Sequence, residues 1–301
     1  MELDKVVKAA RKLSRPYRVT GGKGFRLKDA DPGDTAWLEK EDKPRAKEAL
    51  QTGIEALAHL QDMLYAQDRW GVLLVFQAMD AAGKDGAIKH VMSGVNPQGC
   101  QVSSFKSPSA EELDHDYLWR CNRNLPERGR IGIFNRSYYE EVLVTKVHPE
   151  IIEGQKIPAR YKDKQIFERR YEEINNFEKY LVHNGIVVLK FFLNVSREEQ
   201  KKRFLERIDR ADKNWKFSVA DAQERTFWGR YIRAYEECFR ATSTKWAPWH
   251  VVPADNKWFT RVAVADVICS ALADLKLAYP TLSKAQKKQL VQSRTTLLAE
   301  K

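Results

Sequence analysis

The chain has few cysteines, and they lie far apart. Cys100, Cys121, Cys238 and Cys269 form no C-x-x-C pair. This spacing indicates neither a zinc site nor a disulfide framework, and a reducing compartment is the simplest interpretation, so we expect a cytoplasmic protein. The chain also lacks a run of 18 apolar residues, and its N-terminus has no apolar segment of signal-peptide length. We therefore expect no membrane span and no membrane partner.

Internal repeats and low-complexity tracts are also absent, and acidic residues are in the minority. Lys and Arg total 52 against 41 Asp and Glu, which gives a formal charge of +11 over 301 residues. A chain of this length can bury one large core and form one domain or two. The basic charge favours a polyanionic partner, and nucleic acid, anionic lipid and polyphosphate all qualify.

The stretch GVLLVFQAMDAAGKDGAIKHVMSGV, residues 71–95, combines a strand, a turn and a helix. Residues 72–76 are nearly all apolar, as in a strand covered on both faces of a parallel sheet. Residues 80–86 are small or charged, and apolar residues then recur at helical spacing. Free N–H groups, the helix dipole and the Lys84 ammonium converge after Gly83, which predicts an anion site.

This loop departs from the phosphate-loop pattern G-x-x-x-x-G-K-[ST] at two positions. Ala78 stands in place of the first glycine, and Asp85 in place of the hydroxyl residue. Because that hydroxyl holds magnesium in the motif, a carboxylate such as Asp80 or Asp85 would have to replace it. The alternative is that Gly83 only makes a tight connection and Lys84 is a solvated lysine.

A second apolar strand is predicted at 131–134, and it ends in polar residues. Asn135, Arg136 and Glu140 follow it directly. Since ligands of open α/β sheets lie beyond the carboxyl ends of the strands, we expect these side chains to face the same crevice as Asp80 and Lys84. The alternative is that Arg136 makes only a surface ion pair with the following glutamates.

The rest of the chain alternates between the two kinds of element. Further strands are predicted at 102–105, 186–195 and 250–253, and helices at 46–67, 111–123, 165–183, from Ser196 onward and at 259–277, the closing helix. This alternation predicts a three-layer α/β/α fold with a mainly parallel sheet. We expect residues 1–45 to form an irregular N-terminal arm and residues 46–301 a single phosphate-loop domain.

A basic segment spans residues 197–233. Its cations include Lys201, Lys202, Arg203, Arg207, Arg210, Lys213 and Lys216. Arg203 and Arg207 are four residues apart and share a helix face. A run of this kind is often only a solvated face. Here it follows a strand whose carboxyl end faces the predicted crevice, so a phosphate-binding role is the competing interpretation.

At this point the chain resembles the polyphosphate kinase 2 family. The resemblance rests on residues 76–99, 104–109, 115–120, 131–150, 175–181, 187–208, 214–218 and 247–261, with FQAMDAAGKDG and IGIFNRSYYEE among them. Most members carry Asp and Asn where this chain has Asn135 and Glu140. That exchange resembles the third class of the family, which phosphorylates nucleoside mono- and diphosphates from inorganic polyphosphate.

The resemblance implies a helical lid at about 197–233 and gives the candidate residues their roles. Phosphoryl transfer needs positioning and charge neutralisation, for which we expect Asp80, Lys84, Arg136 and Arg203 as the catalytic set. Phosphate binding is expected from Ala82, Gly83, Lys84, Asp85, Gly86, Lys89, Arg136, Arg203 and Arg207. Asp80 and Glu140 are the candidate metal ligands, with Mg2+ or else Mn2+ as the ion, and Asn135 and Glu140 would select the acceptor. Expected partners are polyphosphate and purine nucleotides, but not nucleic acid, in a homo-oligomer (dimer or tetramer).

Two rival functions stay open on the sequence. An ATP-dependent nucleoside monophosphate kinase of thymidylate-kinase type would share the phosphate loop but need an adenine pocket, for which the sequence gives no clear signal. A basic nucleic-acid-binding protein would explain the charge, although not polar residues at two strand ends. Trp215, Phe217 and Trp228 could contact a base, but aromatic residues at such spacing are more often core residues.

Overall fold

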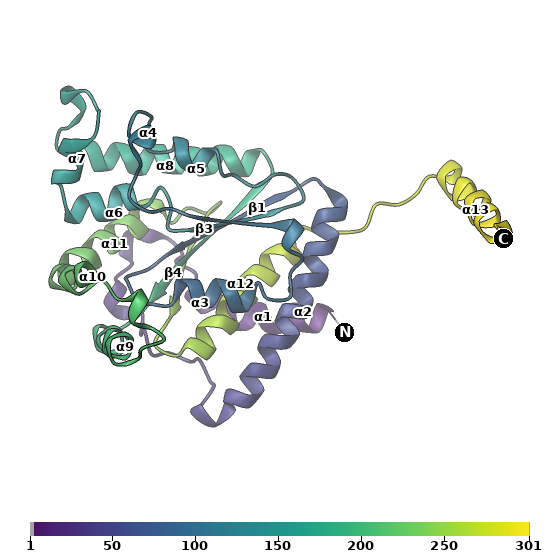
Figure 1. The fold of residues 1–301 in the computed structure, drawn as a ribbon, viewed down its shortest axis with the longest axis horizontal. Coiled ribbons are helices and arrows are strands. Elements are labelled where there is room, and N and C mark those ends of the chain that lie inside the picture. The colour runs from purple at the N-terminus through teal and green to yellow at the C-terminus, as the bar shows by residue number, and fades with distance from the viewer. Residues whose placement is uncertain (1–2, 301) are drawn as a thin grey trace.

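The computed structural model describes residues 3–300 and has a parallel sheet at its centre (Figure 1). Its strands are β1 (Gly71–Gln77), β2 (Cys100–Ser104), β3 (Ile131–Asn135), β4 (Ile186–Asn194) and β5 (Trp249–Pro253). They lie in the order β2-β3-β1-β4-β5, and every neighbouring pair is parallel. All residues of β1 are buried, as its apolar composition predicts for the central strand.

Helices cover both faces of the sheet, which confirms the predicted three-layer α/β/α architecture. One layer holds α1 (Leu3–Ser14), α2 (Lys43–Gln67), α3 (Lys84–Val91) and α12 (Lys257–Asp274). The other holds α6 (Glu140–Val147), α8 (Ile166–His183) and α11 (Trp228–Thr242), with the short helices α4 (Ala110–Leu113), α5 (Trp119–Asn122) and α7 (Glu150–Gly154) near its edge. A hydrophobic core runs through both interfaces.

The predicted lid region is helical. It contains α9 (Arg197–Asp209), a 3-10 turn at Asn214–Lys216, α10 (Val219–Glu224) and the beginning of α11. Ser196 caps α9, because its side chain accepts a hydrogen bond from the backbone N–H of Glu199. The segment leaves the carboxyl end of β4 and returns through α11 to β5, so both of its ends are fixed to the sheet.

The N-terminal segment is more regular than we expected. Residues 3–14 form a helix, and Val7, Ala10 and Leu13 bury one side of it. Short 3-10 turns follow, and Tyr17, Val19 and Leu27 join the hydrophobic core. The expectation of an irregular segment is therefore wrong for 3–14, because spaced apolar residues within a charged stretch suffice to dock a helix. Residues 1–2 lie outside the described chain.

Two further expectations were wrong. The helix expected at 111–123 is broken into α4 and α5, since the Asp116 side chain accepts the N–H of Leu118 and competes with a continuous helix. The helix expected to close the chain is followed by α13 (Lys284–Ala299), which projects away from the body in Figure 1. Ser283 and Gln286 form a capping box at its start, a signal present in the sequence.

Candidate active site

The loop between β1 and α3 places a lysine side chain and free backbone N–H groups close together. Two of its residues take the left-handed backbone conformation, Ala81 with φ of 59° and Gly83 with φ of 106°. Gly83 is the N-cap residue of α3, so the free N–H groups of the first helical turn face the loop. The Lys84 ammonium donates to the carbonyl of Ala78 at 3.0 Å, which holds it over the loop. The groups named in the sequence prediction therefore lie together, and anion binding by them stays a prediction.

The end of β3 lies against this loop, as the sequence predicts. A guanidinium nitrogen of Arg136 is 3.1 Å from a carboxylate oxygen of Asp80. The Asn135 amide donates to Asp85 at 2.8 Å. Parallel pairing of β1 with β3 causes this meeting, because it brings the carboxyl ends of both strands to the same edge. The Arg136 ion pair therefore joins the two loops across the sheet and is not a pair with the following glutamates alone.

Glu140 enters the same electrostatic environment from the first turn of α6. Its carboxylate accepts a hydrogen bond from the Gln77 side chain at 2.7 Å, at the end of β1. Burial lowers the pKa of Lys84, and the carboxylate of Asp80 opposes this shift most strongly, with a smaller contribution from Glu140. Burial also acts to lower the pKa of Arg136, but Glu140 and Asp80 outweigh it, so the net shift is upward. Asp80 and Glu140 therefore both stabilise the charged forms of Lys84 and Arg136.

Arg203 lies at the site but makes contacts different from those we expected. Its side chain is 5% exposed. Its five N–H groups all donate hydrogen bonds within the protein. One goes to the Glu199 carboxylate at 2.9 Å. The others go to the backbone carbonyls of Ala81 at 3.1 Å, Ala82 at 2.7 Å, Ala254 at 2.6 Å and Asp255 at 3.0 Å. No N–H is left for a phosphate oxygen. In this geometry Arg203 fastens the phosphate loop to the segment after β5, and direct phosphate binding by Arg203 stays a prediction.

The two remaining basic candidates occupy different surroundings. Arg207 lines the cavity above the loop and lies 3.8 Å from Asp221 of α10. Burial raises the pKa of Asp221, and the nearby Asp80 raises it further. Lys89 is exposed on α3 and is not part of the cavity lining. The structure thus brings Arg207, but not Lys89, to the cavity.

The cavity has a volume of about 1030 Å³ and a strongly basic lining. Its cations are Lys84, Lys106, Arg136, Arg203, Arg207, Lys213, Lys216, Lys257 and Arg261, and Ala82, Gly83, Asp85, Gly86 and Trp215 also line it. Sequence reasoning missed Lys106, Lys257 and Arg261 as site residues. A signal was available, since all three lie shortly after a predicted strand, where ligand-binding side chains gather.

A second cavity of about 590 Å³ lies beside α4, α7 and α8. Its walls include Tyr117, Ile157 and Pro158, together with the buried pair Glu141–Arg170 at 3.3 Å. None of the candidate catalytic residues lines it.

Among residues 3–300, no helix is long and apolar enough to cross a bilayer.

The candidate metal ligands fit a magnesium ion that is shared with substrate. Within the described part of the chain, no group of three or more His, Cys, Asp or Glu side chains is arranged to hold a metal. Mg2+ at phosphate sites usually takes only one or two carboxylates, with phosphate oxygens and water completing the octahedron. Asp80 and Glu140 supply two carboxylates near the same pair of cations.

Together, the parallel sheet, the loop before α3 and the basic segment at 197–233 are typical of a phosphate-loop phosphotransferase. The model of the polyphosphate kinase 2 family matches residues 38–279. The chain is 51% identical over 283 residues to the ADP-polyphosphate phosphotransferase of Rhodopseudomonas palustris, covering 92% of this chain and 98% of that protein. It is 42% identical over 278 residues to the AMP/ADP-polyphosphate phosphotransferase of Meiothermus ruber, with 92% and 100% covered. The crystal structure of polyphosphate kinase 2 from Arthrobacter aurescens TC1 superimposes with a TM-score of 0.84 at 39% identity, covering 93% of this chain and 96% of that one. This chain belongs to the polyphosphate kinase 2 family.

Proposed function

We propose that the protein transfers the terminal phosphoryl group of inorganic polyphosphate to nucleoside mono- and diphosphates, reversibly. AMP, ADP, GMP and GDP are the acceptors, and nucleoside di- and triphosphates are the products. One observation carries the proposal: Lys84 and Arg136 meet Asp80 and Glu140 at adjacent strand ends beneath a large cation-lined cavity. The relatives that are named for this reaction support it.

The reaction needs charge neutralisation and alignment more than covalent help. Lys84 and Arg136 supply fixed positive charge to the transferred group, and the N–H groups at the start of α3 bind its oxygens. An acceptor phosphate has a second pKa near ~6 and is mostly deprotonated at neutral pH, so a strong general base is not required. Asp80 orients Arg136, and through it the transferred group.

Magnesium, or manganese in its place, would be held by Asp80 and Glu140 together with phosphate oxygens. When bound, the ion neutralises part of the phosphate charge. The chain's own part is to keep both carboxylates within reach of the phosphate loop. Asp80 does so through its pair with Arg136, and Glu140 through its hydrogen bond from Gln77.

Polyphosphate would lie along the cavity, where cations from three parts of the chain line its path. Lys106 follows β2, Arg207 and Lys216 come from the lid region, and Lys257 and Arg261 belong to α12. Burial lowers the pKa of Lys257, and the positive charge of Arg203 adds to this effect. A polyanion that replaces water around these cations would be favoured by their charge, so its binding should weaken as salt rises.

Asn135 and Glu140 are proposed to select the acceptor. Asn135 donates to Asp85 of the phosphate loop, and Glu140 lies near the metal-binding carboxylate Asp80. An added carboxylate there can reposition the ion, so that a monophosphate, which is shorter than a diphosphate, still reaches the donor in line.

The double substitution Asn135→Asp with Glu140→Asn tests this role. We expect the ratio of kcat/KM for AMP to kcat/KM for ADP to fall by about tenfold, or about 1.4 kcal/mol of differential transition-state binding. Both values are measured with polyphosphate as the donor. An unchanged ratio, even at lower overall activity, would show that Glu140 only maintains local structure.

We further propose a cytoplasmic homo-oligomer, either a dimer or a tetramer, in which residues 1–45 form an arm on the kinase domain of residues 46–301. The four widely spaced cysteines, all of them free thiols, support the compartment. The exposed apolar residues Leu290, Val291, Leu297 and Leu298 of α13 are a surface that assembly could cover. Light scattering on the purified full chain measures the number of copies directly.

A further inference from the structure

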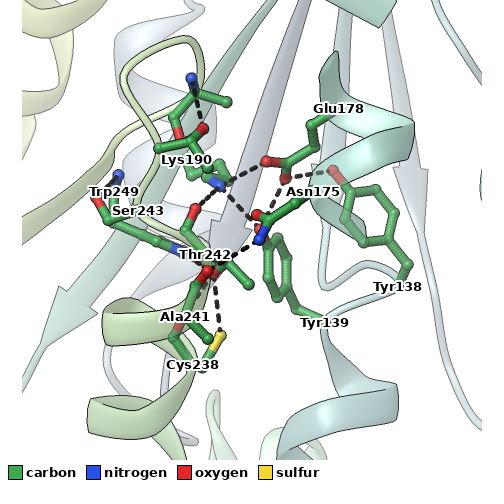
Figure 2. Close-up of polar contacts among 12 residues, drawn as sticks. Tyr138, Tyr139, Asn175, Glu178, Lys190, Cys238, Ala241, Thr242, Ser243 and Trp249 are labelled. Atoms are coloured by element: carbon green, nitrogen blue, oxygen red, sulfur yellow. Dashed lines mark hydrogen bonds and ion pairs between the residues drawn. The ribbon is translucent and has the colours of Figure 1, made fainter. Parts of the chain in front are cut away.

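A buried ion pair lies within the layer beside the active site. Lys190 on β4 and Glu178 on α8 are both fully buried, with 2.6 Å between the Lys190 Nζ and Glu178 Oε2 atoms (Figure 2). Desolvation of two charges is costly, and apolar replacements of such pairs are often neutral or stabilising. Stability alone therefore gives no reason for charges at these positions.

The pair holds the residues that directly follow Arg136. The second oxygen of Glu178 accepts hydrogen bonds from the hydroxyls of Tyr138 at 3.0 Å and Tyr139 at 2.7 Å. Lys190 also donates to the Tyr139 hydroxyl at 2.8 Å. Glu178 thus anchors the chain two and three residues beyond the catalytic arginine.

The backbone at Arg136 needs such an anchor. Its φ angle is 64°, in the left-handed region that is costly for a residue with a side chain and persists only where the surroundings fix it. On one side the Arg136 N–H donates to the Phe76 carbonyl of β1 at 3.0 Å. On the other side the two tyrosines reach the buried pair. The conformation that points Arg136 at Asp80 is therefore held from both ends.

The same pair fixes the end of the helix that returns from the lid region. Lys190 donates to the carbonyl of Thr242, the last residue of α11, at 2.7 Å, and Asn175 donates to the carbonyl of Ala241 at 2.9 Å. Helix ends leave such carbonyls without partners, and a cation is favourable there. Figure 2 shows the two tyrosines, Lys190 and the α11 carbonyls converging on one buried region.

We propose that the Glu178–Lys190 pair is a positioning unit for phosphoryl transfer, which sets the Asn135–Glu140 loop and the end of α11 from one buried point. Both side chains are fully buried, so they act only through the residues that they hold. This inference rests on the proposed function, and it explains why a costly pair of charges stays in the core.

The test removes the two hydroxyls that connect the pair to the loop. In the Tyr138→Phe/Tyr139→Phe protein, Lys190 keeps Glu178 and Thr242 as partners, so the fold should persist. We expect kcat to fall about tenfold while the KM for polyphosphate stays within about twofold, because small displacements of a positioned group cost catalysis more than binding. Cooperative thermal unfolding, followed by circular dichroism, confirms that the variant is folded.

Tyr171→Phe is the matched control. Tyr171 is also buried, on α8, but its hydroxyl has no hydrogen-bond partner. We expect its kcat to equal that of the unmodified protein. The Tyr138→Phe single variant serves if the double variant does not fold, since Lys190 then keeps all three acceptors, and its kcat should fall about threefold.

A double-mutant cycle separates positioning from general loosening. If the tyrosines act through Arg136, their removal should cost much less in an Arg136→Lys background than in the unmodified one. Equal kcat values for the Tyr138→Phe/Tyr139→Phe and Tyr171→Phe proteins, both folded, would overturn the inference, and so would fully additive losses. Absence of turnover in the unmodified protein would instead overturn the proposed function.

Discussion

The basic side chains at this site have different roles, and the hydrogen-bond partners of each side chain indicate its role. Lys84 uses one N–H on the Ala78 carbonyl, and Arg136 is 41% exposed beside Asp80, so both have donors left for phosphate. All N–H groups of Arg203 donate to acceptors of the protein. The number of N–H groups that a guanidinium or ammonium has available for phosphate therefore separates a catalytic role from a structural one.

Replacing Lys84 with Ala should remove transition-state stabilisation and leave the fold intact. We expect kcat to fall about a hundredfold or more, roughly 2.7 kcal/mol, as for loss of one preorganised charge-stabilising group. Steady-state kinetics with polyphosphate and ADP measures it. Lys179→Ala on α8, where the ammonium lies over the Trp246 ring, is the control and should be unaffected. Near-normal kcat in folded Lys84→Ala would return Lys84 to the role of a solvated lysine.

Arg203→Lys tests the positioning role of Arg203. Lysine has three donors in place of five, so buried carbonyls of Ala81, Ala82, Ala254 or Asp255 lose partners. We expect the free energy of unfolding to drop by about 1–3 kcal/mol, the usual cost of leaving buried acceptors unsatisfied. Urea unfolding measures this loss. A protein with unchanged stability and a raised KM for polyphosphate would mean that Arg203 binds phosphate directly.

Residue patterns predicted the parts of the site that depend on local sequence. Asp80, Lys84, Asn135 and Arg136 follow apolar strands, and parallel pairing makes them meet. The role of Arg203 could not be found in this way, because its partners are backbone carbonyls from distant segments. Tyr138 and Tyr139 likewise carry no sequence signal for their shared carboxylate, which comes from α8.

At the scale of elements, apolar patterns predicted the strands and several of the long helices, but other helices were missed. The helix over 3–14 was missed although Val6, Val7, Ala10 and Leu13 recur at helical spacing, because the many charged residues between them obscured this pattern. The break between α4 and α5 was missed because one Asp side chain decides it. Only the second failure occurs where a side-chain contact outweighs the local pattern.

The packing of α12 leads to a prediction about pH. Burial raises the pKa of Asp266 to about 7, whereas an unfolded Asp titrates near ~3.9. The folded state binds this proton more tightly, so stability from the protonated form is present at low pH and is lost as pH rises through about 7.

Asp266→Asn should remove this dependence. Its gain in free energy of unfolding over the unmodified protein should grow from near zero at about pH 4 to a plateau above about pH 8, on the order of 2 kcal/mol after allowance for partial exposure. Urea unfolding at several pH values measures the difference in free energy of unfolding between the two proteins. The contributions of other titrating groups cancel in this difference, because both proteins share them. A gain that is the same at every pH would contradict a raised pKa at this carboxyl.

At the scale of the whole molecule, the net charge and the fold both indicate polyphosphate as the substrate. The formal charge of +11 is concentrated in part around one cavity, which lies at the carboxyl edge of the sheet. Cations reach it from the β2 end, the lid region and α12, so they surround a volume rather than form a flat patch. Such an arrangement suits a flexible chain of phosphates better than a duplex, whose phosphates are spaced along a rigid surface.

The choice of donor tests the central claim most directly. The protein is incubated with Mg2+ and GDP, and either polyphosphate or ATP is the only donor. GTP formation is measured for the unmodified protein and for Lys84→Ala. The account predicts rapid GTP formation from polyphosphate, a loss of about a hundredfold in Lys84→Ala, and little GTP from ATP. GTP formation from ATP but not from polyphosphate would contradict the account.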